Sequence, residues 1–158
     1  MPASSVPAAP SAPSVEGASR PGPTVVLYDR DCGFCRWSLT LVLRWDVRRR
    51  LRPVALQNPE ADELLAGMDA ERRFASAHLV TADGHVYSGG LAARPLLDLL
   101  PHGTPLARVA ALAPGPLRAG YDFVARNRAT LGRPLSKAAK DRATARIDRH
   151  AAQTTPGA

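Results

Sequence analysis

The sequence predicts a mixed α/β domain with the element order β-α-β-α-β-β-α, followed by additional C-terminal helices. The first observation is a strand-like run, Thr24–Tyr28, that leads directly into a helical pattern. The second is a shorter strand and helix that repeat this order, which requires a right-handed crossover and two parallel strands. The third is a strand–turn–strand segment around Ala82-Asp83-Gly84, which is typical of a β-hairpin. Helices are therefore expected to cover a sheet of four strands.

The first strand and helix have the clearest pattern. Thr24–Tyr28 reads TVVLY, which is apolar and β-branched enough for a strand buried on both faces. Asp29–Gly33 is expected to form a turn. A helix should begin near Phe34 or Cys35 and end in three arginines, because cations suit a helix C-terminus. Its apolar residues recur at helical spacing: Leu39, Val42, Leu43 and Val47.

The second strand is predicted over Leu51–Leu56. Asn58 is a good N-cap and Pro59 suits the first helical position, so a short helix is expected from Glu60 to Met68. The two hairpin strands are predicted over Phe74–Thr81 and His85–Ser88.

Several helices are predicted after the hairpin. Gly89-Gly90 should open a helix over Leu91–Leu100, with Pro95 tolerated only in its first turn. The remaining helical patterns cover Pro105–Leu112, Leu117–Leu131 and a basic segment near Ser136–Ile147.

Composition divides the chain into three parts. Residues 1–23 are rich in Pro, Ala and Ser and have too little apolar surface to fold, so we expect a disordered tail. Residues 24–132 form one domain with a helical extension, and residues 133–158 form a basic helix and a flexible tail that includes His150–Ala158. Neither a targeting segment nor a membrane span is evident, so we expect a cytoplasmic protein with no membrane partner.

Positive charge gathers in the C-terminal part of the chain. The net charge is +7, of which residues 1–115 carry +1 and residues 116–158 carry +6. Such a segment could contact nucleic acid, anionic lipid or an acidic protein. No aromatic interleaving or groove-reading motif accompanies it, so nucleic acid is an unlikely partner and a solvated helix face is the simpler interpretation.

The only two cysteines stand in YDRDCGFC, residues 28–35, between the first strand and the first helix. In the thioredoxin-like topology, which has this element order, a CxxC at that corner is the redox pair. A thiol at a helix N-terminus faces unpaired amides and the positive end of the dipole, which lower a cysteine pKa to roughly 3.5–7.5 in such motifs. Cys32 is therefore the expected nucleophile, and Cys35, one turn inside the helix, the expected resolving thiol.

The neighbours of the thiols suggest further roles. Gly33 is expected to let a substrate backbone approach, and Phe34 to form an apolar lip beside the sulfur. Asp29 could accept a proton or cap the turn. Asp29 and Asp31 should raise a thiol pKa, whereas Arg30 and Arg36 should lower it. If the acids dominate, the couple is reducing rather than strongly oxidising, which is the direction we hypothesise.

At these residues the chain resembles the DCC family of predicted thiol-disulfide oxidoreductases, named for an Asp and two Cys in a DxxCxxC motif. Here the motif residues are Asp29, Cys32 and Cys35, and Arg30 stands where the family often has Gly. SAHLVTADGHVYSGGLAA and GYDFVARNR also look like later parts of the family, so the resemblance covers about 24–133. It implies a thioredoxin-like fold and thiol-disulfide exchange.

One departure from ordinary thioredoxins concerns substrate binding. They place a cis-proline before the third strand, beside the redox pair, whereas this chain has no proline there. Ala75, Ser76 and Ala77 should occupy that position, so Ala75 and Ser76 are expected to contact substrate.

Other interpretations of the two cysteines remain open. Half of a zinc site needs further ligands, and no histidine has a finger-like spacing to the cysteines, although His78 or His85 could face the site. Two chains could share an iron–sulfur cluster, or the thiols could be buried and inert. A thioredoxin-like binding module or redox sensor with a basic docking tail is the alternative to an enzyme.

The enzyme hypothesis specifies its partners. The substrate is a disulfide-containing protein or a small thiol. No GxGxxG follows a strand, so we expect no nucleotide or flavin cofactor and no metal, and electrons should come from an upstream thiol reductant.

Overall fold

The computed structural model describes residues 22–155. The predicted disordered tail at residues 1–23 therefore lies almost entirely outside the described residues, as do residues 156–158. The elements follow in this order: β1 (Thr24–Tyr28), α1 (Gly33–Trp45), β2 (Leu51–Ala55), α2 (Pro59–Leu64), α3 (Ala70–Ala75), β3 (His78–Val80), β4 (Val86–Ser88), the 3₁₀ turn η1 (Gly89–Ala92), α4 (Ala93–Leu99), α5 (Thr104–Leu112), α6 (Pro114–Leu131) and α7 (Lys137–Thr154).

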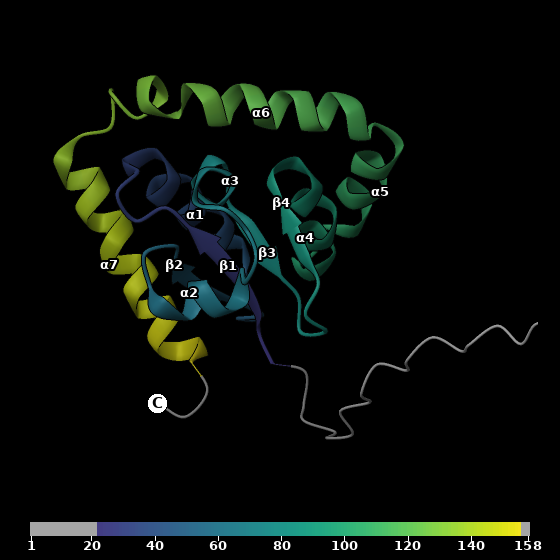
Figure 1. Cartoon of the computed structure of the whole chain (residues 1–158), viewed down its shortest axis with the longest axis horizontal. Coiled ribbons are helices and arrows are strands. Elements are labelled where there is room, and N and C mark those ends of the chain that lie inside the picture. The colour runs from purple at the N-terminus through teal and green to yellow at the C-terminus, as the bar shows by residue number, and fades with distance from the viewer. Residues whose placement is uncertain (1–21, 156–158) are drawn as a thin grey trace, which may run out of the picture.

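The four strands form one sheet in the order β2-β1-β3-β4 (Figure 1). β1 pairs in parallel with β2, while the β1–β3 and β3–β4 pairs are antiparallel. This arrangement confirms the predicted α/β, thioredoxin-like topology. It places the carboxyl end of the central strand β1, and hence the turn into α1, next to β3.

Helices cover both faces of the sheet. Val26 and Tyr28 of β1 point toward a core shared with α1, α4 and α7, which includes Leu39, Leu43, Leu100 and Ile147. The alternate residues Val25 and Leu27 point to a second core, built with β2 and α2, that includes Val54, Leu56, Ala61 and Leu65. β1 is thus buried on both faces, as its continuous apolar run predicts.

The last two helices wrap the α1 side of the domain. α6 lies along one end of the sheet and connects α5 to α7, which runs beside α1 and β2 (Figure 1). α6 packs closely on η1, where a Cβ added at Gly90 would lie 2.9 Å from the Cα of Arg118. The basic segment is therefore packed on the same domain, with α6 against η1 and α1, and α7 against α1 and β2.

The prediction was wrong in the segment before β3. Phe74 and Ala75 end the helix α3, and the strand covers only His78–Val80 rather than Phe74–Thr81. Asp69 caps α3 by accepting a hydrogen bond from the Arg72 N–H at 2.8 Å. This local cap and the helix-forming sequence AERRFA outweigh the strand pattern that follows.

Smaller differences affect helix ends. α2 stops at Leu64 rather than Met68, and the helix expected over Leu91–Leu100 is divided into η1 and α4. Pro95 falls in the first turn of α4, where its missing N–H has no cost.

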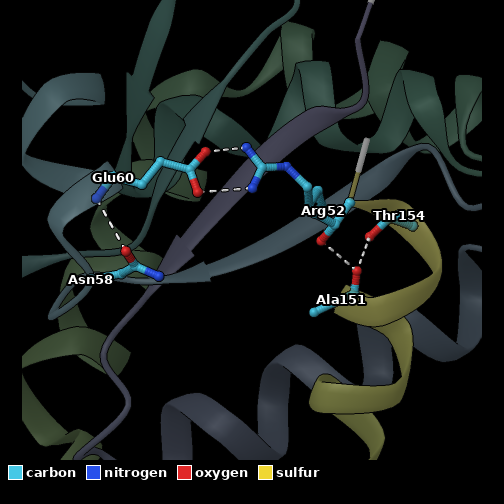
Figure 2. Close-up of polar contacts among 6 residues, drawn as sticks. Arg52, Asn58, Glu60, Ala151 and Thr154 are labelled. Carbon is cyan, nitrogen blue, oxygen red and sulfur yellow. Dashed lines mark hydrogen bonds and ion pairs between the residues drawn. The ribbon is translucent and has the colours of Figure 1, made fainter. Parts of the chain in front are cut away.

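The C-terminal tail was also predicted wrongly in part. α7 continues to Thr154, and His150 and Thr154 are buried rather than flexible. The His150 Nε2–H donates to the carbonyl of Leu51 at 3.1 Å. Figure 2 shows this end of α7, where the Thr154 hydroxyl donates to the carbonyl of Ala151, and the nearby Arg52–Glu60 ion pair. The hydrogen bond from His150 to β2, which a search for apolar residues does not detect, holds this end of the helix against the sheet.

Within residues 22–155, no helix is long and apolar enough to cross a membrane.

Candidate active site

Cys32 is the N-cap of α1. Its Sγ accepts a hydrogen bond from the backbone N–H of Cys35 at 3.2 Å, in the way a serine or aspartate oxygen caps a helix. The helix consequently begins at Gly33, one residue earlier than the apolar spacing predicts. Both cysteines are free thiols and both are partly exposed.

The two thiols have opposite pKa shifts. Hydrogen bonding from the Cys35 side chain is the main cause that lowers the pKa of Cys32 to about 6, against the effect of burial. The Cys35 N–H and the Arg128 guanidinium lower it further, whereas Asp29 raises it. The pKa of Cys35 is raised, first by its hydrogen bond to Cys32, then by burial and the charge of Cys32. At pH 7 one thiolate and one thiol therefore stand side by side.

This result weakens one argument for the reducing couple, which itself stays a hypothesis. That hypothesis required the neighbouring acids to dominate the electrostatics of Cys32, but the pKa of Cys32 falls despite Asp29. A stabilised thiolate favours the dithiol form, so it makes the couple more oxidising. The cation that contributes is also not one of the two expected arginines: Arg36 donates instead to Thr144 on α7 at 2.7 Å.

A network around Gln57 holds the turn between β1 and α1. Asp29 Oδ1 accepts from the Asp31 N–H at 3.0 Å and from the Gln57 amide at 2.8 Å. The same amide group donates to Asp31 at 3.2 Å, and Gln57 Oε1 accepts from the Arg30 N–H at 3.1 Å. Asp29 thus caps the turn, as the sequence suggests, while Gln57, which no motif indicated, fixes its carboxylate.

An apolar cavity of about 280 Å³ lies on the Cys35 side of the motif. Five of the residues singled out from the sequence line it: Asp29, Phe34, Cys35, Ala75 and Ser76. The rest of the lining comes mainly from apolar side chains, including Leu39, Val42, Leu96, Tyr121 and Val124. Ser76 has an extended backbone, with φ −148° and ψ 168°. It stands at the position before the third strand where ordinary thioredoxins have a cis-proline and this chain has no proline.

A second, more open groove of about 310 Å³ lies on the Cys32 side. Cys32, Gly33 and Phe34 form one wall, and the opposite wall comes from the end of α6 and the start of α7. Gly33 does not have a positive φ, and a Cβ built on it would lie 2.8 Å from Cε of Lys140. The space above Gly33, which we expected a substrate backbone to use, is therefore occupied by the Lys140 side chain.

Two side chains of α6 hold the segment that faces the thiols. The Tyr121 hydroxyl accepts from the Ala77 N–H at 2.9 Å, and the Arg128 guanidinium donates to the Phe74 carbonyl at 2.9 Å. These residues are seven apart, hence on one face of the helix. Arg128 lines both the cavity and the groove. The segment GYDFVARNR contains both, but sequence alone favoured a solvated face for Arg128.

The two histidines of the hairpin, His78 and His85, contact other residues than the cysteines. His78 is buried, with Nδ1 2.8 Å from the Ser88 hydroxyl and Nε2 2.9 Å from the Arg73 carbonyl, so it is a packed residue of β3. His85 lies 2.9 Å from Asp83 at the exposed hairpin turn. Across the described part of the chain, no three His, Cys, Asp or Glu side chains are grouped so as to hold a metal ion.

Comparison with known proteins identifies one family. Residues 26–134 match the model of the DCC1-like thiol-disulfide oxidoreductases. Neither the curated proteins nor the solved structures provide a match to this chain.

Proposed function

Because the chain belongs to the DCC1-like thiol-disulfide oxidoreductase family, we propose that it catalyses thiol-disulfide exchange on protein or small-molecule disulfides by cycling Cys32 and Cys35 between dithiol and disulfide. The observation that supports this proposal most strongly is the Cys32 sulfur, which accepts a hydrogen bond from the Cys35 N–H at 3.2 Å and is partly exposed at the start of α1. A buried inert pair would show neither the exposure nor the lowered pKa.

The proposed reaction has two exchanges. The Cys32 thiolate attacks one sulfur of a substrate disulfide, a Cys32–substrate bond forms, and the first substrate thiolate leaves. Cys35 then loses its proton and attacks Cys32, which releases the second substrate thiolate and leaves a Cys32–Cys35 disulfide. An upstream dithiol reduces this disulfide by the same chemistry, so two electrons pass from that dithiol to the substrate.

We assign Asp29 to the second exchange. Cys35 has a raised pKa and cannot act until its proton is removed. Asp29 lines the same cavity as Cys35, and its carboxylate is held in place by Gln57 at 2.8 Å. A carboxylate at this position can accept the proton directly or through one water molecule.

We assign substrate contact to the rims of the two hollows. Phe34 separates them, and Ala75 and Ser76 line the apolar side. Gly33 lines the other hollow, but the Lys140 side chain covers it, so we assign it no substrate contact. The extended Ser76 backbone suits pairing with an extended substrate segment. We propose a cytoplasmic reaction, where thiol systems supply reducing equivalents.

A disulfide-reductase assay on the wild type and Cys32→Ser tests this function. The wild type should reduce a disulfide substrate with an added dithiol as electron donor, and Cys32→Ser should lose the activity. Cys35→Ser should instead accumulate a mixed disulfide on Cys32, visible by mass spectrometry. Full activity of Cys32→Ser would contradict the proposal that the protein is a thiol-disulfide oxidoreductase. An internal disulfide that forms without turnover would favour the alternative, a redox sensor or binding module.

A further inference from the structure

We propose that the thiol or disulfide substrate is a small molecule with carboxylates close to its sulfur, and that the groove beside Cys32 binds these carboxylates through Lys140 and Arg133, with Arg128 at the Phe34 side. We call this hollow the basic groove. The inference rests on the proposed function and assigns its substrate class.

The basic groove is lined by more positive than negative side chains. Three cations, Arg128, Arg133 and Lys140, line it together with one acid, Asp31. None of the three cations forms an ion pair with another residue of the described chain. Asp31 is already hydrogen-bonded by the Gln57 amide at 3.2 Å. The groove therefore carries more positive than negative charge beside the sulfur that reacts first, and its cations have no ion-pair partner among the described residues.

Lys140 is directed to this place by packing. Its aliphatic chain lies over Gly33, within 2.8 Å of the position a Cβ would take there. α7 is held against α1 by the Arg36–Thr144 hydrogen bond, only one turn after Lys140. The lysine is partly buried, unlike the exposed Lys137 on the same helix, which pairs with Asp141. A cation held beside a reactive sulfur favours ligands of opposite charge, and the effect grows as water is excluded.

The size of the groove indicates a small substrate. Its volume of about 310 Å³ lies at the lower end of the range for small-molecule pockets, roughly 300–1,000 Å³. The end of α6 closes one side, where Gly132 is buried against Phe34. A disulfide with a carboxylate a few bonds from sulfur can thus place the sulfur at Cys32 and the charge at Lys140 or Arg133.

The chemical step is unchanged by this assignment. The Cys32 thiolate forms a bond to one sulfur of the carboxylate-bearing disulfide, the disulfide bond breaks, and the carboxylate-bearing thiolate leaves and takes a proton from solvent. The cations neutralise the substrate charge that would otherwise repel the attacking thiolate, but they do not exchange protons or electrons.

Three disulfides of similar size and different charge test the inference. 3,3′-Dithiodipropionate carries two negative charges, bis(2-hydroxyethyl) disulfide none, and cystamine two positive charges. The rate of mixed-disulfide formation is measured by mass spectrometry on Cys35→Ser at low salt, and each rate is divided by that of 2-mercaptoethanol with the same disulfide. We expect the dianion to react about tenfold faster than the neutral disulfide and the dication to react slowest, with the difference reduced at high salt.

Charge variants locate the effect. In the Cys35→Ser background, Lys140→Gln and Arg133→Gln should each lower the ratio of dianion rate to neutral rate about threefold. This ratio does not depend on how much of Cys32 is ionised. Arg149→Gln is the matched control, since it removes the same charge from an exposed position on α7 near Arg44. Arg44 lies about 18 Å from Cys32 at 1.5 Å per residue, so this variant should keep the ratio.

The outcomes separate the two proposals. If Cys32 reacts with all three disulfides at equal relative rates, or if Arg149→Gln lowers the ratio as much as Lys140→Gln, the substrate class is wrong while the proposed function stands. If Cys32 reacts with none of them, the proposed function itself fails.

Discussion

At each end of α1 a side chain accepts backbone N–H groups, yet one end is closed and the other is reactive. At the C-terminal end, Asp46 Oδ1 accepts from Arg50 at 3.0 Å, and Oδ2 accepts from Leu51 at 2.9 Å. His150 lies 3.3 Å from Oδ2, and the Asp46 side chain is 0% exposed. At the N-terminal end, the Cys32 sulfur accepts only from Cys35 and remains partly exposed.

One end of α1 therefore contributes to the stability of the fold, and the other end provides the reactive thiol. The Asp46 carboxylate is fully engaged in contacts that hold the start of β2 and the end of α7 in place. Cys32 keeps a lone pair and access to a groove. α7 contacts both ends, through Lys140 at Gly33 and His150 at Asp46, so it runs alongside α1 in the same direction. Changes at the two ends should therefore affect different measurements.

The largest effect is expected at the closed end. Asp46→Ala leaves the backbone N–H groups of Arg50 and Leu51 without an acceptor, so the free energy of unfolding should fall by about 3 kcal/mol. Urea denaturation measures the loss. The pH dependence of Cys32 alkylation should stay unchanged in the folded variant. A loss below about 0.5 kcal/mol would show that the hydrogen bonds of Asp46 contribute little to stability, which would contradict the contrast between the two ends of α1.

At the reactive end, Cys35→Ala should have the strongest influence on Cys32. The Cys35 side chain is the main cause of the lowered pKa, so its removal should raise the pKa of Cys32 from about 6 toward the ordinary value of 9.0. The alkylation rate at pH 6 should then fall about tenfold for each pKa unit gained. Iodoacetamide kinetics between pH 4 and 10 measure this. The backbone N–H of residue 35 and the charge of Arg128 are retained, so any lowering of the pKa that remains reports these two contributions.

The same lowered pKa links reactivity to stability. A thiolate whose folded pKa lies below its unfolded value stabilises the reduced protein fully above pH 9, and this contribution is lost as the pH falls through about 6. The stabilised dithiol also raises the reduction potential. We expect a value between about −270 mV, typical of thioredoxin, and about −180 mV, typical of protein disulfide isomerase. Equilibration with glutathione measures it, and a value of about −120 mV, typical of a strongly oxidising thiol enzyme, would contradict the hypothesis of a reducing couple.

Arg128→Gln should produce a smaller change of the same sign. The guanidinium lowers the pKa of both cysteines, but it ranks below the hydrogen bonds as a cause for Cys32. Alkylation at pH 6 should slow about twofold to threefold. Arg126→Gln removes an exposed charge two residues away on the same helix and should leave the rate unchanged. Equal effects of the two variants would mean that only net charge matters.

Asp29→Asn should produce the smallest change, with the opposite sign. Its charge is the weakest of the causes for Cys32 and raises the pKa, so the variant should lower that pKa slightly. Alkylation at pH 6 should therefore be as fast as in the wild type or slightly faster, while release of a mixed disulfide by Cys35 should slow. If release keeps its rate, Asp29 caps the turn and does not accept the Cys35 proton.

Sequence reasoning succeeded where local patterns decide the structure. The apolar run Thr24–Tyr28 predicted a strand buried on both faces, and Asn58-Pro59 predicted a helix start; both are present. The strand expected at Phe74 failed because the Asp69 cap, a stronger local signal, was overlooked. The prediction for the end of α7 was wrong because His150 and Thr154 are buried there, and His150 bonds to the Leu51 carbonyl of β2.

In the candidate site, too, the residues of a local motif could be predicted and those brought in by tertiary contacts could not. The motif residues Asp29, Cys32 and Cys35 could be named from spacing alone, and the structure places them around one strand–helix corner. Gln57, Arg128 and Lys140 reach this corner from other elements, and no spacing rule connects them to it. The net electrostatic effect on Cys32 therefore depends on tertiary contacts, which explains why the sign of its pKa shift could not be summed from the neighbouring residues.

The position of α7 has a consequence for how the protein is made. Thr144, which fixes α7 against α1, lies 108 residues after its partner Arg36. During synthesis the thiols leave the ribosome long before the helix that covers Gly33 and supplies Lys140, and contacts so distant in sequence form late. The nascent chain thus carries its cysteines in an unfinished strand–helix corner until α7 is made.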